Sequence, residues 1–324
     1  MEFPLLAERP IGPGQQINLM DRPSILANDI SKSYGDVKAL TNISLSIGKG
    51  ELYGLIGPDG AGKTSLFRIL TSLLIQNSGK AEVEGFDTVK DFKSLRKILG
   101  YMPGRFSLYH DLTVEENLEF FATIFGTTIQ ENYDLIRDIY VQIEPFKNRK
   151  AGKLSGGMKQ KLALSCALIH KPEVLFLDEP TTGVDAVSRK EFWEMLRSLQ
   201  KKGITIMVST PYMDEASLCD QVALIQKGKI LSINTPEKIV EQYKHPLVKV
   251  ITDNMFKLPE HLLNFPQAES AYRFGDSVHF ASHQEINVPD LSSFLEKNDH
   301  RNIVIEKIVP NIEDCFMALL KNEN

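Results

Sequence analysis

The stretch from Glu51 to Ser65, which reads ELYGLIGPDGAGKTS, limits what this chain can fold into more than any other part of it. A short apolar run leads into the glycine-rich segment GPDGAGKT, and the helix-like segment SLFRILTSLL follows almost at once. This order predicts a strand, a tight loop and a helix. Gly57, Gly60 and Gly62 allow the loop backbone to curl around an anion, because bulkier residues would block the turn or the ligand.

The end of this loop carries side chains that suit a nucleotide and its metal ion. The helix that begins near Gly62 directs free N–H groups and the positive end of its dipole toward phosphates. Lys63 can reach the outer phosphates, Thr64 offers a hydroxyl to Mg²⁺, and Ser65 is placed to contact an inner phosphate. Strand, loop and helix therefore predict a Walker A motif. Its eight residues are Gly57, Pro58, Asp59, Gly60, Ala61, Gly62, Lys63 and Thr64.

The composition is typical of a soluble globular protein. The chain has 324 residues, enough for one large domain and a small one, and its apolar and charged fractions of 42% and 24% argue against disorder. No stretch approaches the ~18 apolar residues of a membrane helix, and the first residues lack the pattern of a signal peptide. We therefore expect a cytoplasmic protein. The net charge of −5 argues against a nucleic-acid partner.

The sequence divides into three predicted parts. Residues 1–23 carry four prolines and two glycines without an apolar period, which predicts a flexible arm. Residues 24–240 alternate strand and helix patterns, as an α/β domain does, and a helical subdomain covers about 104–168 within them. Residues 241–324 contain shorter segments in the order β-α-β-β-α-β-α, which predicts a small α+β domain.

Local signals mark individual elements. The segments SILANDIS and ALTNISLSI alternate apolar and polar residues as half-buried strands do, and SKSYGDVKA between them reads as a turn. Tyr34 in this turn is a candidate for stacking on a nucleotide base, and an ordinary tyrosine at a strand end is the alternative. Thr113 and Glu116 have the spacing of a capping box, which predicts the start of a helix.

A second anion site is predicted at the segment KLSGGMKQKLALSCALIH. Two glycines open an apolar-periodic helix that should run to about Ile169. Ser155 and the N–H groups of Gly156 and Gly157 lie at the mouth of this helix, where the dipole favours an anion.

The run VLFLDEP predicts a fully buried parallel strand whose carboxyl end delivers two acids. Because side chains alternate along a strand, Asp178 and Glu179 can face different partners, one a metal and the other a water. The alternative is that these acids cap the next helix.

Taken together, these segments resemble the nucleotide-binding subunit of an ABC transporter, and more closely the kind paired with ABC-2-type exporter permeases. The resemblance covers about Ser24 to Leu320. It rests on the order of Tyr34 as the A-loop aromatic, GPDGAGKT, the signature LSGGM, VLFLDEP as Walker B, and a D-loop that ends at Asp185. The signature residues are Leu154, Ser155, Gly156, Gly157 and Met158.

The resemblance implies a P-loop ATPase core of α/β class with a helical subdomain. It further implies a head-to-tail dimer, homomeric or heteromeric, that holds ATP between the Walker A loop of one chain and the signature of the other. By that analogy Asp178 and Thr64 hold Mg²⁺ and Glu179 polarises the attacking water. The partner would be an integral membrane ABC-2-type permease, with this chain peripheral on the cytoplasmic face.

Two departures from the family pattern affect the γ-phosphate. Where the family has a glutamine in the Q-loop this chain has Gly104, and where it has the switch histidine this chain has Pro211. Proline has neither a side-chain donor nor a backbone N–H. Loss of one preorganised donor costs roughly 10²- to 10³-fold in turnover at comparable sites. We therefore expect this chain to bind ATP and to hydrolyse it poorly.

Two classes of function follow from this pattern. The favoured one is an ATP-binding subunit that couples ATP binding and hydrolysis to transport by a separate permease. The alternative is a regulatory ABC module that binds ATP as a switch with little hydrolysis. Intact Lys63, Asp178 and Glu179 fit both.

Overall fold

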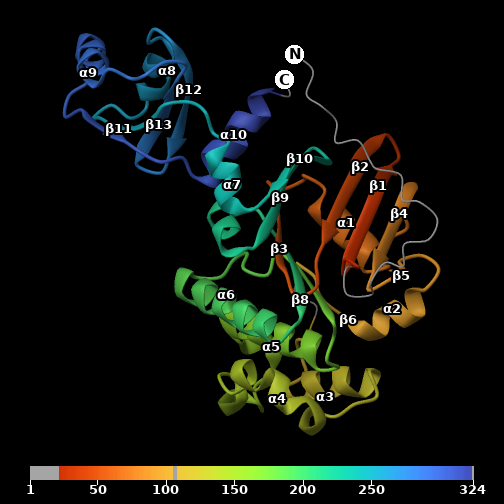
Figure 1. Ribbon diagram of the computed structural model, residues 1–324. Helices are drawn as coiled ribbons and strands as arrows, with labels where there is room; N and C mark the ends of the chain where they lie inside the picture. Colours follow the sequence, from red (N-terminus) through yellow and green to blue (C-terminus); the bar gives the residue numbers. More distant parts are fainter. Residues whose placement is uncertain (1–21, 105–107, 323–324) are drawn as a thin grey trace.

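The computed structural model describes residues 22–104 and 108–322, and its centre is a six-stranded sheet in the order β10-β9-β3-β8-β7-β6 (Figure 1). Strands β3, β6, β7, β8 and β9 run parallel, and β10 pairs antiparallel with β9. Every residue of β3, β7 and β8 is buried, as expected for apolar runs inside a parallel sheet. The strand bounds are Leu52–Ile56 (β3), Leu99–Met102 (β6), Val174–Asp178 (β7), Thr205–Thr210 (β8), Gln221–Gln226 (β9) and Lys229–Asn234 (β10).

A second, antiparallel sheet in the order β2-β1-β4-β5 covers helix α1 (Lys63–Leu70). Both sheets and α1 contribute to one apolar cluster, in which the rings of Phe67 and Phe176 meet edge to face with centroids 5.8 Å apart. This packing holds α1 on one face of the central sheet, at the carboxyl end of β3. The strand bounds are Ile25–Tyr34 (β1), Val37–Ile47 (β2), Ser78–Val83 (β4) and Phe86–Asp87 (β5).

Helices α5 (Gly156–Leu168) and α6 (Ala186–Lys201) cover the other face of the central sheet, and α3 (Val114–Ile124) and α4 (Ile129–Tyr140) pack against α5 (Figure 1). Side chains from all four helices belong to a second apolar cluster. The predicted capping box at Thr113 and Glu116 is confirmed at the start of α3, and Thr128 with Glu131 forms a second one at α4. Helix α2 (Phe92–Ile98) and the short 3-10 turns η2 (Glu144–Phe146), η3 (Ala151–Lys153) and η4 (Met213–Leu218) complete this part.

Two details differ from the expectation. The long turn predicted around Tyr34 was wrong, because Ser33 pairs with Lys38 and Tyr34 with Val37, which leaves a tight turn in which Gly35 has a φ of 57°. The apolar run ILGYMPG predicts a strand that starts at Ile98, but Ile98 ends helix α2 and only residues 99–102 form β6.

The C-terminal part follows helix α7 (Pro236–Glu241) and has its own sheet in the order β12-β13-β11-β14. All its pairings are antiparallel, and helices α8 and α9 pack on one face around Val248 and Phe280. Such a β-α-β-β-α-β unit has the ferredoxin-like arrangement, and the element order is the predicted one. The bounds are Leu247–Ile251 (β11), Leu258–Leu263 (α8), Ala268–Phe274 (β12), Ser277–Ser282 (β13), Val288–Lys297 (α9), Val304–Lys307 (β14) and Ile312–Asn322 (α10).

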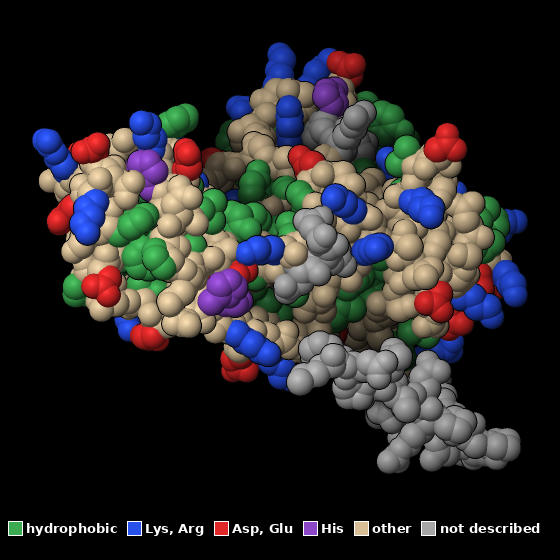
Figure 2. Space-filling view, turned by 90° about the horizontal axis from the view of Figure 1, so that it is seen from above, with side chains coloured by type: hydrophobic (Ala, Val, Ile, Leu, Met, Phe, Trp, Pro, Cys, Tyr) green, Lys and Arg blue, Asp and Glu red, His purple; other side chains and the backbone are tan. Residues whose placement is uncertain are grey.

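Three further observations concern the helices, the surface charge and the N-terminal arm. Within residues 22–104 and 108–322, no helix is both long and apolar enough to cross a membrane. On the face seen in Figure 2, Lys and Arg side chains are interspersed with Asp and Glu rather than gathered in one basic stripe. The arm predicted for residues 1–23 lies almost wholly outside the described residues.

Candidate active site

The glycine loop between β3 and α1 passes so close to its neighbours that side chains are excluded at its two ends. A Cβ on Gly57 would lie 2.2 Å from the carbonyl oxygen of Ile225, and one on Gly62 would lie 2.5 Å from that of Ala39. Gly62 also has a φ of 106°, a conformation that side chains disfavour. The close contacts with β9 and β2 therefore require glycine at both ends of the curled loop.

Lys63, the first residue of α1, joins this loop to the acids after β7. Its buried Nζ donates hydrogen bonds to the carbonyl oxygens of Gly57 at 2.8 Å and Pro58 at 3.0 Å. The same Nζ forms an ion pair with Glu179 Oε1 at 3.0 Å. The structure thus brings the predicted phosphate-binding lysine and the predicted catalytic glutamate into direct contact.

Ser209, which was not among the predicted site residues, organises both acids. Its hydroxyl donates to Asp178 Oδ1 at 2.6 Å. The N–H of Glu179 donates to the Ser209 carbonyl oxygen at 3.0 Å and lies 3.1 Å from its hydroxyl, and Glu179 has a φ of 51°. The sequence shows a serine near the end of an apolar run. Only the pairing of β7 with β8 reveals that this serine lies beside Asp178.

Tyr34 lies beside the Walker A helix. Its hydroxyl is 3.4 Å from Ser65 Oγ, its side chain is about half exposed, and Lys32 Nζ lies 5.6 Å from the ring centroid. The structure therefore brings the two predicted residues together at an accessible edge of the site, where an aromatic face can meet a flat ligand.

Gly104 and Pro211, the two departures from the family pattern, lie near the acids and near the glycine loop, respectively. A Cβ on Gly104 would lie 3.0 Å from the Asp178 carbonyl oxygen and 3.8 Å from Glu179 Cβ. Pro211 follows Thr210, whose carbonyl oxygen accepts a hydrogen bond from Gly57 N–H at 3.2 Å. Gly104 therefore borders the acids, and Pro211 adjoins a residue that is bonded to the loop.

The signature segment lies beside the D-loop. Ser155 caps α5 by accepting a hydrogen bond from Met158 N–H at 3.4 Å. A Cβ on Gly156 would lie 3.5 Å from the Gly183 carbonyl oxygen, and one on Gly157 would lie 2.7 Å from Ser188 Oγ. Leu154 is buried next to these residues in the chain. Helix α5 belongs to the apolar cluster opposite that of α1, so the signature is separated from the chain's own Walker A helix by the central sheet.

Asp185 caps helix α6 rather than reaching the Walker A loop. Its carboxylate accepts hydrogen bonds from the N–H groups of Val187 at 3.1 Å and Ser188 at 3.0 Å. The Ser188 hydrogen bond is the main reason why the pKa of Asp185 is lowered. The alternative in which Asp178 and Glu179 cap this helix is therefore wrong.

A buried carboxylate links this region to the segment after Pro211. Glu215 in η4 is only 1% exposed and accepts a hydrogen bond from Thr181 Oγ1 at 2.9 Å, while Arg189 Nε lies 3.7 Å away. The sequence reasoning missed this contact, because it joins residues 34 positions apart.

These residues fit a nucleotide triphosphate with Mg²⁺. The glycine loop leaves no room for a Cβ at its two ends, and its lysine is held at the loop. Helix α1 begins at this loop, and no side chain of the described residues caps it, which suits an anion. Thr64 and the buried Asp178 supply a hydroxyl and a carboxylate, the hard oxygen ligands that Mg²⁺ prefers.

Comparisons with known proteins agree with this geometry. The profile of the ABC transporter family matches residues 40–182. The probable multidrug ABC transporter ATP-binding protein YbhF of Escherichia coli (strain K12) is 38% identical over 307 residues, which are 93% of this chain and 53% of YbhF. The chain therefore spans about half the length of that relative.

Other relatives match over nearly their whole length. The daunorubicin resistance ATP-binding protein DrrA2 of Streptomyces coeruleorubidus is 30% identical over 317 residues, covering 93% of this chain and 96% of DrrA2. The ATP-binding cassette MJ0796, solved as a dimer in a post-hydrolysis state with ADP and Pi, superposes with a TM-score of 0.59 at 25% identity over 65% of this chain and 98% of that one. The predicted fold class, an α/β P-loop ATPase cassette, is confirmed. The chain belongs to the family of ABC transporter ATP-binding proteins.

Proposed function

We propose that this chain is the ATP-binding subunit of an ABC exporter and couples ATP binding and hydrolysis to transport by a separate membrane permease. The contact of Lys63 with Glu179, beside the Asp178–Ser209 pair, is the observation that carries the proposal. The printed names of the relatives, which include multidrug and daunorubicin resistance proteins, support an export role. The chain would then lie at the cytoplasmic face of the membrane.

The chain's own residues suggest how the site would work. Lys63 would exchange its contact with Glu179 for phosphate oxygens, which frees the glutamate to accept a proton from water. Tyr34 would stack on the base, and Thr64 and Asp178 would hold Mg²⁺, which neutralises phosphate charge when bound. Ser209 would keep Asp178 in place through its hydrogen bond. The residues Gly57 to Ser65 would enclose the phosphates.

The same site would be catalytically weak. Gly104 and Pro211 border the acids and the loop, yet neither has a polar side chain to orient water or to bind the γ-phosphate. This observation also favours the second candidate function, a regulatory module in which ATP acts as a switch. The export subunit and the regulatory module differ in whether a partner cassette restores ATP turnover.

A head-to-tail dimer would make the weakness asymmetric. The signature from Leu154 to Met158 and the adjacent Asp185 are separated from the chain's own loop and would serve the nucleotide of a partner. Gly104 and Pro211 affect only the nucleotide on this chain. A homodimer would contain two weak sites, whereas a heterodimer with a second cassette would contain one weak site and one competent site.

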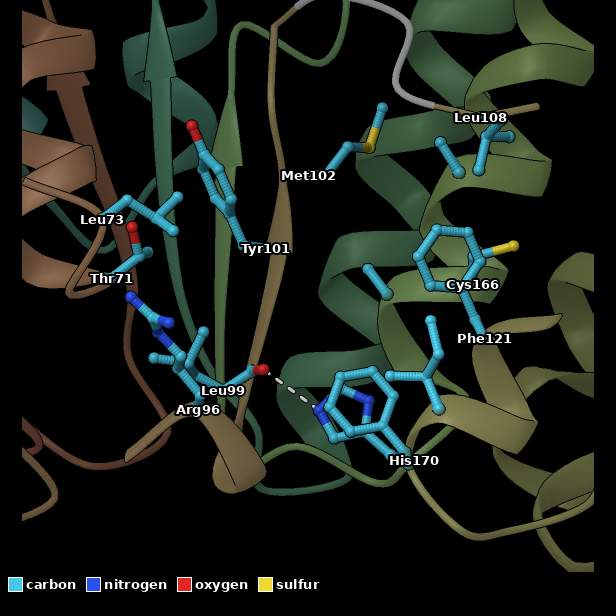
Figure 3. A pocket seen from close by; sticks show the side chains of 14 residues that line it. Thr71, Leu73, Arg96, Leu99, Tyr101, Met102, Leu108, Phe121, Cys166 and His170 are labelled. Atoms are coloured by element: carbon cyan, nitrogen blue, oxygen red, sulfur yellow. Dashed lines mark hydrogen bonds between the residues drawn. The ribbon is translucent and has the colours of Figure 1, made fainter. Parts of the chain in front are cut away.

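The permease would dock in an apolar groove of about 340 Å³ between β6, the end of α1 and the helical subdomain (Figure 3). Phe125 and His170 stack on its wall with ring centroids 3.7 Å apart, and His170 Nε2 lies 3.0 Å from the Leu99 carbonyl oxygen. The sequence itself favours docking at residues 104–109, because this loop joins the core to the helical subdomain and carries the aromatics Phe106 and Tyr109. Phe106 lies outside the described residues, and Tyr109, half exposed, packs edge to face on Phe120 with centroids 4.6 Å apart.

Leu73→Asp is expected to release the permease without affecting ATP binding. Leu73 lines the groove and is 54% exposed, so a carboxylate there disturbs an apolar contact rather than the core. Affinity purification of the tagged full chain from detergent-solubilised membranes, with the associated membrane protein identified by mass spectrometry, measures the loss.

Ile75→Asp is the matched control, because Ile75 is 64% exposed on the same loop and does not line the groove. Retention of the permease by Leu73→Asp, or its equal loss from both variants, would contradict docking in this groove.

Ser209→Ala is expected to raise the half-saturating Mg²⁺ concentration for MgATP binding about tenfold. It removes the hydroxyl that donates to Asp178, and a hydrogen bond to a charged group contributes roughly 1.5–3 kcal/mol. Calorimetric titration of ATP at a series of Mg²⁺ concentrations measures this shift. Ser165→Ala is the control, since Ser165 is also buried and donates to the Lys161 carbonyl oxygen on α5. An unchanged Mg²⁺ requirement in Ser209→Ala would show that the serine does not hold the metal ligand.

A further inference from the structure

A second groove lies between the segment that follows Pro211 and the C-terminal part of the chain. It has a volume of about 620 Å³ and is formed by η4, α7 and the start of α10. Its apolar lining comes from Met213, Pro236, Val240 and Ile312. Drug-sized ligands occupy cavities of roughly 300–1,000 Å³ with such a lining.

The charged residues that line this groove are all acidic. They are Asp214, Glu237, Glu241 and Glu313. Asp214 is neutralised by Arg189, whose guanidinium lies 2.8 Å from its Oδ2. Among residues 22–104 and 108–322, no basic group forms an ion pair with Glu237, Glu241 or Glu313. The groove thus combines an apolar lining with three carboxylates that have no ion-pair partner in the described part of the chain.

We propose that this groove binds a hydrophobic organic cation. Apolar surface of the ligand would leave water on binding to Met213, Val240 and Ile312, which favours binding. A positive charge would be attracted by the surrounding carboxylates, whereas an anion of the same shape would be repelled. Charge complementarity therefore selects a cation over a neutral or anionic apolar molecule.

The groove joins two parts of the molecule. Segment η4 begins two residues after Pro211, and its Glu215 is hydrogen-bonded to Thr181 just after the Walker B acids. Helix α10 is tied to the C-terminal sheet by Asp314 Oδ1, which lies 2.8 Å from His279 Nδ1. A ligand in the groove would contact both, which gives it access to the segment next to the nucleotide site.

Tetraphenylphosphonium and tetraphenylborate test the proposal, because they share shape and apolar area and differ in the sign of charge. Equilibrium dialysis or calorimetry with the purified full chain, without nucleotide or permease, should show saturable binding of the phosphonium at one site. The borate should bind at least about tenfold more weakly. Absent phosphonium binding, or equal binding of both ions, would overturn the proposal.

Two variants locate the site. Glu237→Gln with Glu241→Gln should weaken phosphonium binding about tenfold, since two favourable charge contacts are lost. Glu260→Gln with Glu296→Gln is the matched control, which removes the same charge from exposed positions outside the groove.

Ser217→Arg places a cation in the groove from an exposed position and should abolish binding, which keeps the test valid if the glutamine variant folds poorly. Full phosphonium binding by this variant would place the ligand elsewhere. Because no step involves ATP, the proposal can fail while the function proposed above stands.

Discussion

Lys63→Ala is expected to lower the affinity for MgATP by at least about 100-fold. The Lys63 ammonium is the cation held at the glycine loop, between the carbonyl oxygens of Gly57 and Pro58 and the Glu179 carboxylate. Loss of a charge-assisted hydrogen bond corresponds to roughly 1.5–3 kcal/mol, and each 1.4 kcal/mol is tenfold in affinity. The variant also leaves Glu179 unpaired beside the phosphates, which adds repulsion. Calorimetric titration with MgATP measures the change.

Lys201→Ala is the control for this experiment, because Lys201 is exposed at the end of α6 and its removal changes the net charge equally. Thermal unfolding of both variants checks that the fold is retained. Saturable binding by Lys63→Ala with wild-type affinity would show that the loop between β3 and α1 is not the nucleotide site.

Restoring both missing polar groups, with Gly104→Gln and Pro211→His together, is expected to raise ATP turnover by the purified chain about 100-fold. A preorganised donor at the reacting phosphate typically contributes roughly 10²- to 10³-fold. Gly104 borders the acids, and Pro211 adjoins a residue bonded to the loop. The Gly104 position has room for a side chain only after a small adjustment, because a Cβ would lie 3.0 Å from the Asp178 carbonyl oxygen. Steady-state phosphate release measures the rate.

Gly104→Ala with Pro211→Ala is the matched control. It introduces the same Cβ contact at Gly104 and returns the N–H at Pro211, but it adds neither an amide nor an imidazole. Its turnover should stay at the wild-type level. Brisk hydrolysis by the wild-type homodimer, unchanged in the restored variant, would mean that the missing groups do not limit catalysis, and the asymmetric dimer would lose its physical basis.

The sequence predicted most local features because their causes are local. The glycine loop needs residues without a Cβ at Gly57 and Gly62, and the pattern of glycines records that need directly. The capping box at Thr113 involves residues three apart, so spacing alone reveals it. The continuous apolar run VLFLDEP likewise identified β7 as a buried parallel strand.

Two predictions from local sequence were wrong, and each has a physical reason. The turn around Tyr34 was predicted too long because the polar residues Ser33 and Lys38 pair across the two strands, and a short pairing beside a tight glycine turn leaves little trace in the pattern. The beginning of β6 was misplaced because the apolar Ile98 suits a helix end and a strand start equally well.

By itself the sequence determined the elements, the loop and the acids that suit nucleotide chemistry, since each depends on residues close together in the chain. Only the tertiary structure decided which of them meet. The pairing of β7 with β8 places Ser209 against Asp178, and the order of the central sheet brings Lys63 to Glu179. The tertiary structure also forms the second groove, because α7, η4 and α10 meet there. Strand order and helix packing depend on the contacts of the whole core, which join residues far apart in the chain, and no local pattern encodes them.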